Sequence, residues 1–438
     1  MGAREGLGEP VQATSPGYSP RMSAPPAVPT ALTLPGDQTL KLLRRGYRFF
    51  DELGDTGAEV VRMRLMGRRA TVVRGEEGAR LFYTEPSLRR APALPELVVG
   101  SLFGHGAVHT LDGAGHHHRK ALFTSLATPA ASARVVADLT QGWEGAVDGW
   151  EGTVDLHEEV SLLILRAGCR WLGLALDPTD GRRRAADMVA MVDGFGSVGA
   201  RQVRARLARA RSELWVAGQL RERRERGTAG PGGADPLDVV AGHRDLDGDL
   251  LPLRVAAVET LNLLRPLVAV TWLVSSGVRA LDDLPELRRR LAEGEVSSLW
   301  VAQEVRRVYP FAPALAATPG QDLVWRGVDV PAGSLLVLNV WATDHDPVLW
   351  PRPDVFDPDR FATQTVTPWN LLPQGGGAVS TGHRCPGEDL TLSVLATLLR
   401  ALAASGVRVG SSTAVRLDRM PPDPSCLVRV GPARTLAG

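Results

Sequence analysis

Hydrophobic residues recur at helical spacing over most of the chain, and segments with the alternating or purely apolar pattern of strands are few and short. The helical pattern covers residues 76–83, 116–127, 130–149, 155–172, 182–194, 200–225, 251–281, 283–293 and 295–309. One further amphipathic helix is predicted from Leu40, Leu42, Leu43, Tyr47 and Phe50. Short strands are predicted at 60–64, 70–73, 323–325 and 335–340. The pattern therefore predicts a mainly α fold with a minor β part.

The sequence predicts an N-terminal tail followed by a single domain. Residues 1–35 hold seven prolines and no long apolar segment, so we expect a disordered tail there and one catalytic domain over 36–438. The glycine-rich segment 226–235 is predicted to be an exposed loop.

The apolar run 251–281 has the length of a membrane span. We expect a buried central helix instead, because polar residues interrupt the run: Arg254, Glu259, Asn262, Arg265 and Pro266.

Composition narrows the choice of partners. Fifty basic residues balance 49 acidic ones, so the net charge of +1 gives no field that would attract nucleic acid or anionic lipid. The three cysteines, Cys169, Cys385 and Cys426, are widely separated and form no Cys-X-X-Cys pair. Such cysteine usage is typical of a reducing compartment and argues against a disulfide framework. We therefore expect a cytoplasmic protein that acts on small molecules.

The segment around Cys385 carries the most specific chemistry. Three glycines follow Gln374, and they permit close approach of the backbone to a flat or bulky group. Pro386 suits the first turn of a helix with Glu388 at its third position, which places Cys385 at a helix N-terminus. Free N–H groups there lower the pKa of a thiol. A thiolate in such a loop suits an axial haem ligand. The alternative is a small buried thiol at a helix cap.

This segment resembles the haem-binding loop of the cytochromes P450. Two further motifs agree with that resemblance: Glu304-Val-Arg-Arg307 matches the ExxR helix of the family, and residues 353–361, which include Arg360, match its meander. The resemblance implies the cytochrome P450 fold and a thiolate-ligated haem b, with Cys385 as the ligand of the iron. It also implies that Glu304, Arg307 and Arg360 pair with one another and support the haem pocket.

The resemblance is closer to one branch of the family. The loop reads PQGGG…GHRCPGE instead of the usual FxxGxRxCxG, and this form, together with residues 304–313, resembles the bacterial fatty-acid peroxygenases and decarboxylases. The similarity extends over roughly residues 32–432. It implies oxidation of long-chain fatty acids at Cα or Cβ with hydrogen peroxide, giving 2- and 3-hydroxy acids and terminal alkenes by decarboxylation. It also implies that no redox partner is obligatory.

The apolar run supports this branch through Arg265 and Pro266. A proline inside a helix costs about 3 kcal/mol and frees the carbonyl of Asn262. A buried guanidinium needs an anion, and its fork fits a carboxylate with two hydrogen bonds. That anion could also be Glu259 or a haem propionate. The Arg-Pro pair is a hallmark of the branch, so the resemblance assigns Arg265 and Pro266 to catalysis and Arg265 to the substrate carboxylate.

Glu259 and Thr260 leave a second function open. They resemble the acid–alcohol pair of the oxygen-activating cytochromes P450, which would indicate a conventional reductase-dependent monooxygenase. A non-catalytic haem protein that binds carboxylic acids is a third possibility. Residues five apart on a helix cannot face the same point, so Thr260 and Arg265 cannot both act on one group. Since Arg265 lies nearer to the position of the oxygen-activating pair relative to Glu304, we favour Arg265.

Residues 102–112 resemble the distal-pocket segment of the branch. The resemblance implies that Phe103 contacts the acyl chain and that His109 stands where members of the branch carry Gln or His. His at this position goes with more alkene. Since an imidazole can carry a proton near neutral pH and an amide cannot, we expect this difference to act through the proton. His105 is expected to be exposed.

The remaining candidates surround the cofactor and the acyl chain. Adjacent residues on a helix point about 100° apart, so His116, His117 and His118 do not predict a metal site. His116 and Lys120 share a face, and the resemblance implies that they bind a haem propionate. It implies the same for Arg90 and for His383 or Arg384.

Weaker similarities place three residues near the acyl chain, although each could be ordinary packing: Val198, Phe311 and Met420. Ala314 stands where relatives often carry Phe, which would widen the pocket.

Overall fold

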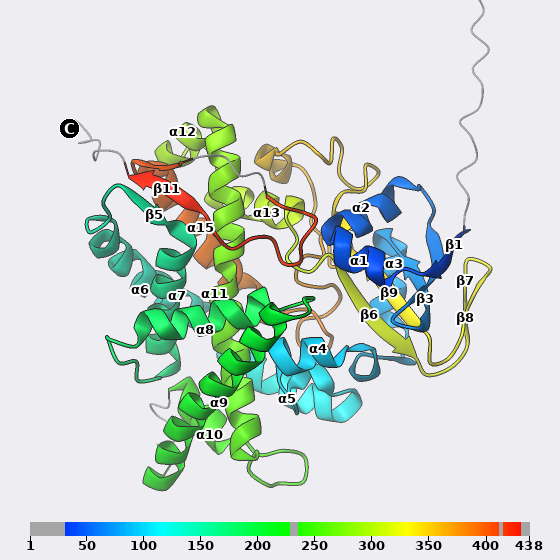
Figure 1. The fold of residues 1–438 in the computed structure, drawn as a ribbon, viewed down its shortest axis with the longest axis horizontal. Helices are drawn as coiled ribbons and strands as arrows, with labels where there is room; N and C mark the ends of the chain where they lie inside the picture. Colours follow the sequence, from blue (N-terminus) through cyan, green and yellow to red (C-terminus); the bar gives the residue numbers. More distant parts are fainter. Residues whose placement is uncertain (1–30, 228–234, 411–414, 431–438) are drawn as a thin grey trace, which may run out of the picture.

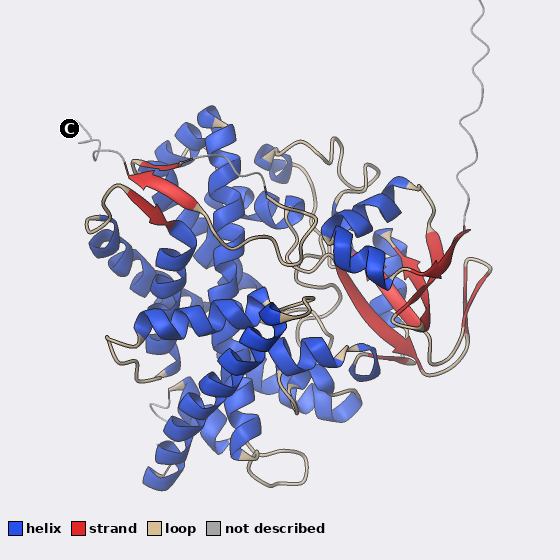
Figure 2. Ribbon diagram, viewed as in Figure 1, coloured by secondary structure: helices blue, strands red, loops and turns tan. Residues whose placement is uncertain are grey.

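The computed structural model describes residues 31–227, 235–410 and 415–430. A large helical body forms one side of the molecule, and the main sheet with its flanking helices forms the other (Figures 1 and 2). The helical body contains α5 (Gly113–Leu126), α6 (Pro129–Val147), α7 (Leu156–Leu172), α8 (Gly181–Asp193), α9 (Ala200–Arg226), α10 (Pro236–Gly242), α11 (Leu253–Asp283), α12 (Pro285–Glu293), α13 (Ser298–Val308) and α15 (Glu388–Ala404). The predicted mainly α fold is confirmed.

The main sheet has the strand order β1-β2-β3-β9-β6-β4. Its strands are β1 (Ala31–Asp37), β2 (Val60–Leu65), β3 (Arg68–Val73), β4 (Leu88–Arg89), β6 (Ala314–Pro319) and β9 (Leu335–Asn339). The pairs β1–β2 and β3–β9 are parallel, and the others are antiparallel. The helices α1 (Thr39–Arg45), α2 (Tyr47–Asp55), α3 (Gly75–Thr84) and α14 (Val340–Asp344) belong to the same side of the molecule.

Smaller elements complete the fold. One small sheet joins β5 (Thr153–Asp155), β10 (Val407–Val409) and β11 (Leu427–Val430), and β7 (Leu323–Trp325) forms a hairpin with β8 (Val328–Val330). Short helical turns lie between β4 and α5: η1 (Ala91–Ala93), α4 (Glu96–Val98), η2 (Val99–Phe103) and η3 (Val108–Thr110). One more, η4 (Pro358–Ala362), lies in the predicted meander.

The N-terminal segment differs from the sequence prediction in two places. Residues 31–35, predicted as part of a tail, belong to β1, and the rest of that tail lies outside the described residues. The predicted helix near residues 40–50 is two helices, because Gly46 takes a positive φ of 53° between them. A Cβ at Gly46 would lie 2.7 Å from the backbone nitrogen of Arg419, so this turn requires glycine. The predicted loop after α9 falls largely outside the described residues.

Helix α11 is the central element of the core. It packs against α7, α8, α9 and α15, and Figure 1 shows it running through the whole helical body. Within the described ranges it alone is long and apolar enough to cross a membrane, but 83% of its apolar window is buried inside the protein. The expected buried central helix is therefore confirmed.

Two glycines let neighbouring helices approach α11 closely. A Cβ at Gly168 in α7 would lie 2.7 Å from Leu264 Cδ1, one residue before Arg265. A Cβ at Gly277 in α11 would lie 2.6 Å from Leu399 Cδ2 in α15. Both contacts are shorter than packed carbon atoms allow, so a larger residue at either position would require the leucine side chain to move.

A buried histidine between α7 and α11 makes stability sensitive to acid. His157 Nδ1 lies 3.2 Å from Ser275 Oγ, and burial, assisted by Arg279, lowers the pKa of His157 to about 3. The unfolded chain takes up this proton near pH 6.5, so the contribution of His157 is complete above that pH and is lost as the pH falls toward 3. Between pH 6 and 4, the difference in unfolding free energy between wild type and His157→Gln should shrink by about 1.4 kcal/mol per pH unit.

Urea denaturation at several pH values measures this difference. The exposed His117 gives a matched control, because His117→Gln should leave the pH dependence of stability unchanged. Equal pH slopes for His157→Gln and wild type would contradict the prediction.

Candidate active site

A cavity of about 310 Å³ lies between α11 and the loop that precedes α15. Arg265 and Pro266 of α11 line it, and so do Gln374 and Cys385 of the loop. His109 and Phe311 also line it, from segments far away in the sequence. The fold thus brings the predicted thiolate, the predicted carboxylate-binding arginine and the predicted distal histidine to one cavity.

Cys385 is fixed through its backbone. Its N–H donates to the carbonyl oxygen of Gln374 at 2.9 Å. Helix α15 begins at Glu388 with Gly387 as its N-cap, so the prediction that Pro386 opens the helix is wrong by two residues. Burial raises the pKa of the Cys385 thiol, although the Gly387 N–H opposes this effect. The predicted lowering of the pKa by the helix N-terminus is thus present but is outweighed by burial, and a metal cation is the group that deprotonates such a thiol.

The glycines before Cys385 serve the packing of the loop. Gly375 and Gly377 have positive φ values of 90° and 74°. A Cβ at Gly375 would lie 2.9 Å from the hydroxyl oxygen of Tyr83 in α3, and a Cβ at Gly376 would lie 2.5 Å from the carbonyl oxygen of Pro368. Tyr83 and Pro368 thus fill the space beside these two glycines, so packing within the protein requires glycine there.

The supporting charge cluster has the predicted partners. Arg307 donates to Glu304 with two hydrogen bonds of 2.8 Å, and Arg360 donates to the same carboxylate at 3.1 Å. The side chains of Glu304 and Arg307 are fully buried. A second cluster was not predicted: Arg306 and Arg384 both donate to Glu388 at 2.6 Å. The Arg384 side chain is therefore engaged by Glu388, and its assignment to a propionate stays a prediction.

Basic side chains gather at one end of the cavity. Lys120 Nζ donates to the backbone carbonyl of Arg384, and the rings of His116 and His383 stack with their centres 4.0 Å apart. Burial lowers the pKa of His116 to about 4 and that of Lys120 to about 8. A nearby anion would favour the charged forms of these side chains and offset the cost of their burial, so the cluster suits the propionates of a haem. Together, the Cys385 thiol and this cluster provide a ligand for the iron of a haem and partners for its propionates.

Arg90 lies behind this cluster. Its guanidinium stacks on the Phe82 ring at 3.6 Å and donates to the carbonyl oxygen of Phe82 at 2.8 Å. The side-chain contacts of Arg90 are therefore with α3, and its assignment to a propionate stays a prediction.

His109 lines the cavity and packs against Phe103, which is not among the lining residues, so the predicted contact of Phe103 with the acyl chain stays a prediction. The two rings stack with their centres 4.1 Å apart, and Nδ1 of His109 is buried with no hydrogen-bond partner among the described residues. Burial, assisted by the charge of Arg265, lowers the pKa of His109 to about 3. The imidazole is therefore neutral near pH 7 in the protein without substrate, and its action through a proton stays a prediction. His105, by contrast, is exposed as expected.

Arg265 is a buried cation that has no carboxylate partner in the part of the chain that the structure describes. Its Nη2 donates to Asn262 Oδ1 at 3.0 Å, while its Nε has no hydrogen-bond partner within residues 31–227, 235–410 and 415–430. Burial, reinforced by the charge of Arg209, lowers the pKa of Arg265 to about 9. An anion at this position would remove the penalty. The site is therefore suited to a carboxylate.

The competing acid–alcohol pair is engaged elsewhere. Glu259 accepts hydrogen bonds from Arg119 and from the backbone N–H of Val108, both at 2.8 Å. The Thr260 hydroxyl donates to the carbonyl oxygen of Ala256 at 2.9 Å. Both side chains are fully buried. The alternative in which Arg265 pairs with Glu259 is therefore wrong.

The residues predicted to lie near the acyl chain are only partly brought together. Phe311 lines the cavity and stacks near Phe195, with ring centres 6.0 Å apart. Val198 is 58% exposed on the connection between α8 and α9, so the structure places it at the surface. Met420 packs beside Gly196. Ala314 opens strand β6 and pairs with Asn339.

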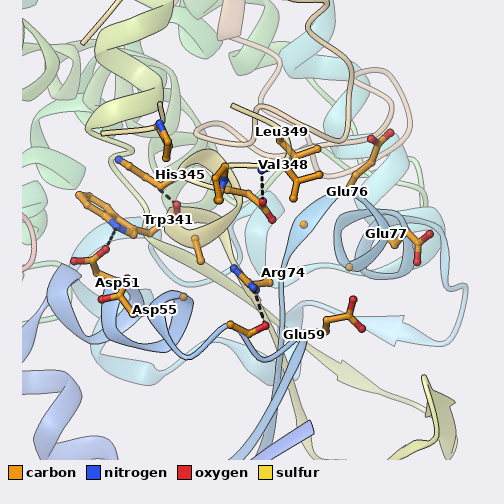
Figure 3. Close-up of a pocket in the computed structure, with 18 of the residues that line it drawn as sticks. Asp51, Asp55, Glu59, Arg74, Glu76, Glu77, Trp341, His345, Val348 and Leu349 are labelled. Atoms are coloured by element: carbon orange, nitrogen blue, oxygen red, sulfur yellow. Dashed lines mark hydrogen bonds between the residues drawn. The ribbon is translucent and has the colours of Figure 1, made fainter. Parts of the chain in front are cut away.

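A larger cavity of about 870 Å³ lies on the side of the molecule that holds the main sheet (Figure 3). Carboxylates dominate its wall: Asp51, Asp55, Glu59, Glu76 and Glu77. The indole of Trp341 donates to Asp51 at 2.9 Å, which ties α14 to α2 there. This wall would repel an anionic substrate, so size does not identify the active site here.

Comparisons with known proteins agree with the geometry. The cytochrome P450 family model matches residues 299–402. Among curated proteins, (+)-piperitol/(+)-sesamin synthase CYP81Q2 of Sesamum radiatum is 33% identical over 129 residues, which are 28% of this chain and 25% of that sequence. Thromboxane-A synthase of Rattus norvegicus is 40% identical over 106 residues, 23% of this chain and 19% of that sequence. The chain thus spans a quarter or less of the length of these two relatives.

Solved structures match over nearly the whole length. Cytochrome P450EX alpha (CYP152N1) with myristic acid is 33% identical, with a TM-score of 0.86 over 92% of this chain and 98% of that one. Ligand-free cytochrome P450 OleT is 33% identical, with a TM-score of 0.85 over 91% of this chain and 99% of that one. The chain therefore belongs to the cytochrome P450 family, in its CYP152 branch of fatty-acid peroxygenases and decarboxylases, whose cofactor is a thiolate-ligated haem b.

Proposed function

We propose that this protein is a haem-thiolate peroxygenase that oxidises long-chain fatty acids at Cα or Cβ with hydrogen peroxide. The observation that carries the proposal is Arg265, a buried cation without a carboxylate partner in the described residues, in the cavity that Cys385 also lines. Relatives support it, because P450EX alpha was solved with myristic acid and a variant of OleT with arachidonic acid. Both structures contain a carboxylic acid with an apolar chain.

The side chains of this site account for substrate orientation. Arg265 would bind the carboxylate, and apolar residues of the same cavity, such as Leu267 and Phe311, would contact the chain. Holding the carboxylate fixes the position of Cα and Cβ, so orientation selects the carbon that reacts. Haem ligated by Cys385 supplies the redox chemistry, in which peroxide is reduced and a C–H bond oxidised. The bound carboxylate itself is the acid–base group beside the peroxide, since Glu259 is occupied by Arg119.

The overall reaction balances in two ways. In hydroxylation, one oxygen atom of hydrogen peroxide enters the C–H bond and the other leaves as water. In decarboxylation, the acid and one peroxide give a terminal alkene, carbon dioxide and two waters. A redox partner protein is not needed in either case. The expected cytoplasmic location and the lack of a nucleic-acid partner stay predictions.

Product analysis with purified holoenzyme tests the proposal. A mixture of medium- and long-chain fatty acids is incubated with hydrogen peroxide alone, and in parallel with NADPH and a reductase system. Hydroxy acids and alkenes should form with peroxide alone. Turnover that requires the reductase system would identify the conventional monooxygenase instead, and binding of acids without turnover would identify a carboxylic-acid binder.

His109 should set the ratio of the two products. It lines the cavity beside Arg265, and His at this position goes with more alkene in the relatives that the sequence resembles. We predict α- and β-hydroxy acids together with a measurable alkene fraction, and His109→Gln should shift the mixture toward hydroxylation while peroxide use persists. Gas chromatography measures the ratio.

His105→Gln is the matched control for this variant. It makes the same change in the same segment, but His105 is exposed and contacts Glu96, so the product ratio should stay at the wild-type value. An unchanged ratio in His109→Gln would show that the imidazole does not direct the outcome.

A further inference from the structure

Glu259 lies at the centre of a buried hydrogen-bond network that reaches Arg265 and the segment before His109. Its Oε1 accepts from Arg119 Nη1 and from the Val108 N–H, both at 2.8 Å. Its Oε2 accepts from Asn262 Nδ2 at 3.2 Å. All three partners are donors, which is the set that an ionised carboxylate takes and a protonated one does not need.

These contacts join segments that are distant in the sequence. Arg119 in α5 is 3% exposed at its side chain and donates through Nη2 to Asp245 at 2.6 Å. Val108 opens η3, the turn that carries His109. Glu259 and Asn262 lie on α11, one turn apart. A single carboxylate therefore connects α5, η3 and α11 beside the cavity.

The network fixes which way the Asn262 amide points. One end of this amide lies 3.0 Å from the carbonyl oxygen of Phe103 and 3.2 Å from Glu259 Oε2. Both neighbours are acceptors, so this end must be the NH₂ group. The oxygen then faces Arg265, and it accepts from Arg265 Nη2 at 3.0 Å.

We propose that Glu259 is a positioning residue for substrate binding: paired with Arg119, it holds the Asn262 amide with its oxygen toward Arg265 and thereby aims the guanidinium at the fatty-acid carboxylate. The same carboxylate anchors the backbone beside His109. This inference rests on the proposed function, because it assigns a role in binding the acid. The residue that resembles an oxygen-activating acid in the sequence would thus act through its neighbours.

Glu259→Gln tests the inference with little change in shape. If the oxygen of the new glutamine still accepts the hydrogen bonds from Arg119 and Val108, the NH₂ group of the glutamine faces the NH₂ group of Asn262. Asn262 must then turn, which points an NH₂ group at Arg265 and an oxygen at the Phe103 carbonyl. We expect the Kd of palmitic acid to rise about tenfold, while the Kd of the uncharged palmityl alcohol changes little.

Calorimetric titration of the holoenzyme measures both Kd values, and the carbon monoxide spectrum verifies that the haem site is intact. Asp282→Asn is the matched control. Asp282 is also an acid on α11 that accepts from an arginine, Arg288, and from a backbone N–H, that of Val409, at the far end of the helix. The Asp282→Asn variant should lose stability and keep the wild-type Kd for palmitic acid.

Asn262→Ala gives a second route that leaves the Glu259–Arg119 pair in place. This variant should raise the Kd of palmitic acid by a similar factor. The double variant Glu259→Gln/Asn262→Ala should bind palmitic acid no more weakly than Asn262→Ala alone, because both changes act through one contact. If Glu259→Gln does not fold, Asn262→Ala decides alone. A wild-type Kd for palmitic acid in either single variant, or additive losses in the double variant, overturns the inference. A wild-type protein that binds no palmitic acid overturns the proposed function instead.

Discussion

Arg265→Ala should abolish most fatty-acid oxidation while leaving the haem site intact. A desolvated charge pair that loses one partner costs roughly 3–5 kcal/mol, which corresponds to a fall of about 10² to 10⁴-fold in kcat/KM. The guanidinium is buried at the cavity wall with Asn262 as its hydrogen-bond partner. The other long basic side chains of this cavity are already engaged, Lys120 by a backbone carbonyl and Arg306 by Glu388. Initial rates with hydrogen peroxide and palmitic acid measure the loss.

An uncharged substrate separates binding of the carboxylate from general damage. Palmityl alcohol lacks the anion, so its Kd should be nearly the same for wild type and Arg265→Ala. The thiolate spectrum of the variant should also match wild type, since Arg265 lies on α11 and Cys385 on the loop before α15. Full activity of Arg265→Ala on fatty acids would refute the role of this arginine.

Cys385→Ala should remove the thiolate signature of the haem. Reduced wild-type protein with carbon monoxide should show the strongly red-shifted Soret band of thiolate ligation, and the variant should lose that band together with peroxide-driven turnover. The physical reason is that the thiolate donates electron density that favours O–O cleavage. Absorption spectroscopy and product analysis measure the two effects.

Cys169→Ala is the matched control among the cysteines. Cys169 is buried in α7, and burial raises the pKa of its thiol to about 12, which is the behaviour of an inert core residue. This variant should keep the spectrum and the activity. A normal thiolate spectrum in Cys385→Ala would show that another residue ligates the iron.

Local motifs predicted the central residues of the site because their spacing is contained in short segments. Glu304 and Arg307 lie one helical turn apart, so the sequence alone places them side by side. The register of α11 likewise places Arg265 and Pro266 on a buried helix. Such inferences need only the period of a helix and the cost of burying charge.

Contacts between distant segments could not be predicted in this way. Glu259 and Arg119 are 140 residues apart, and only the fold shows that Arg119 satisfies this carboxylate. The same holds for Tyr83, which fills the space beside Gly375. The lowered pKa of His109 likewise follows only from the fold, since burial and the charge of Arg265 are properties of the assembled cavity.

The glycine contacts of α11 bear on how this enzyme could be adapted to other acids. Gly168 holds α7 against Leu264, the neighbour of Arg265, and Gly277 holds α15 against the same helix. A larger side chain at either glycine would force Leu264 or Leu399 out of its present position, and Leu264 is the direct neighbour of the arginine. Libraries that aim at new chain lengths should therefore vary residues outside this packed region, such as Phe311, and leave the three-helix contact untouched.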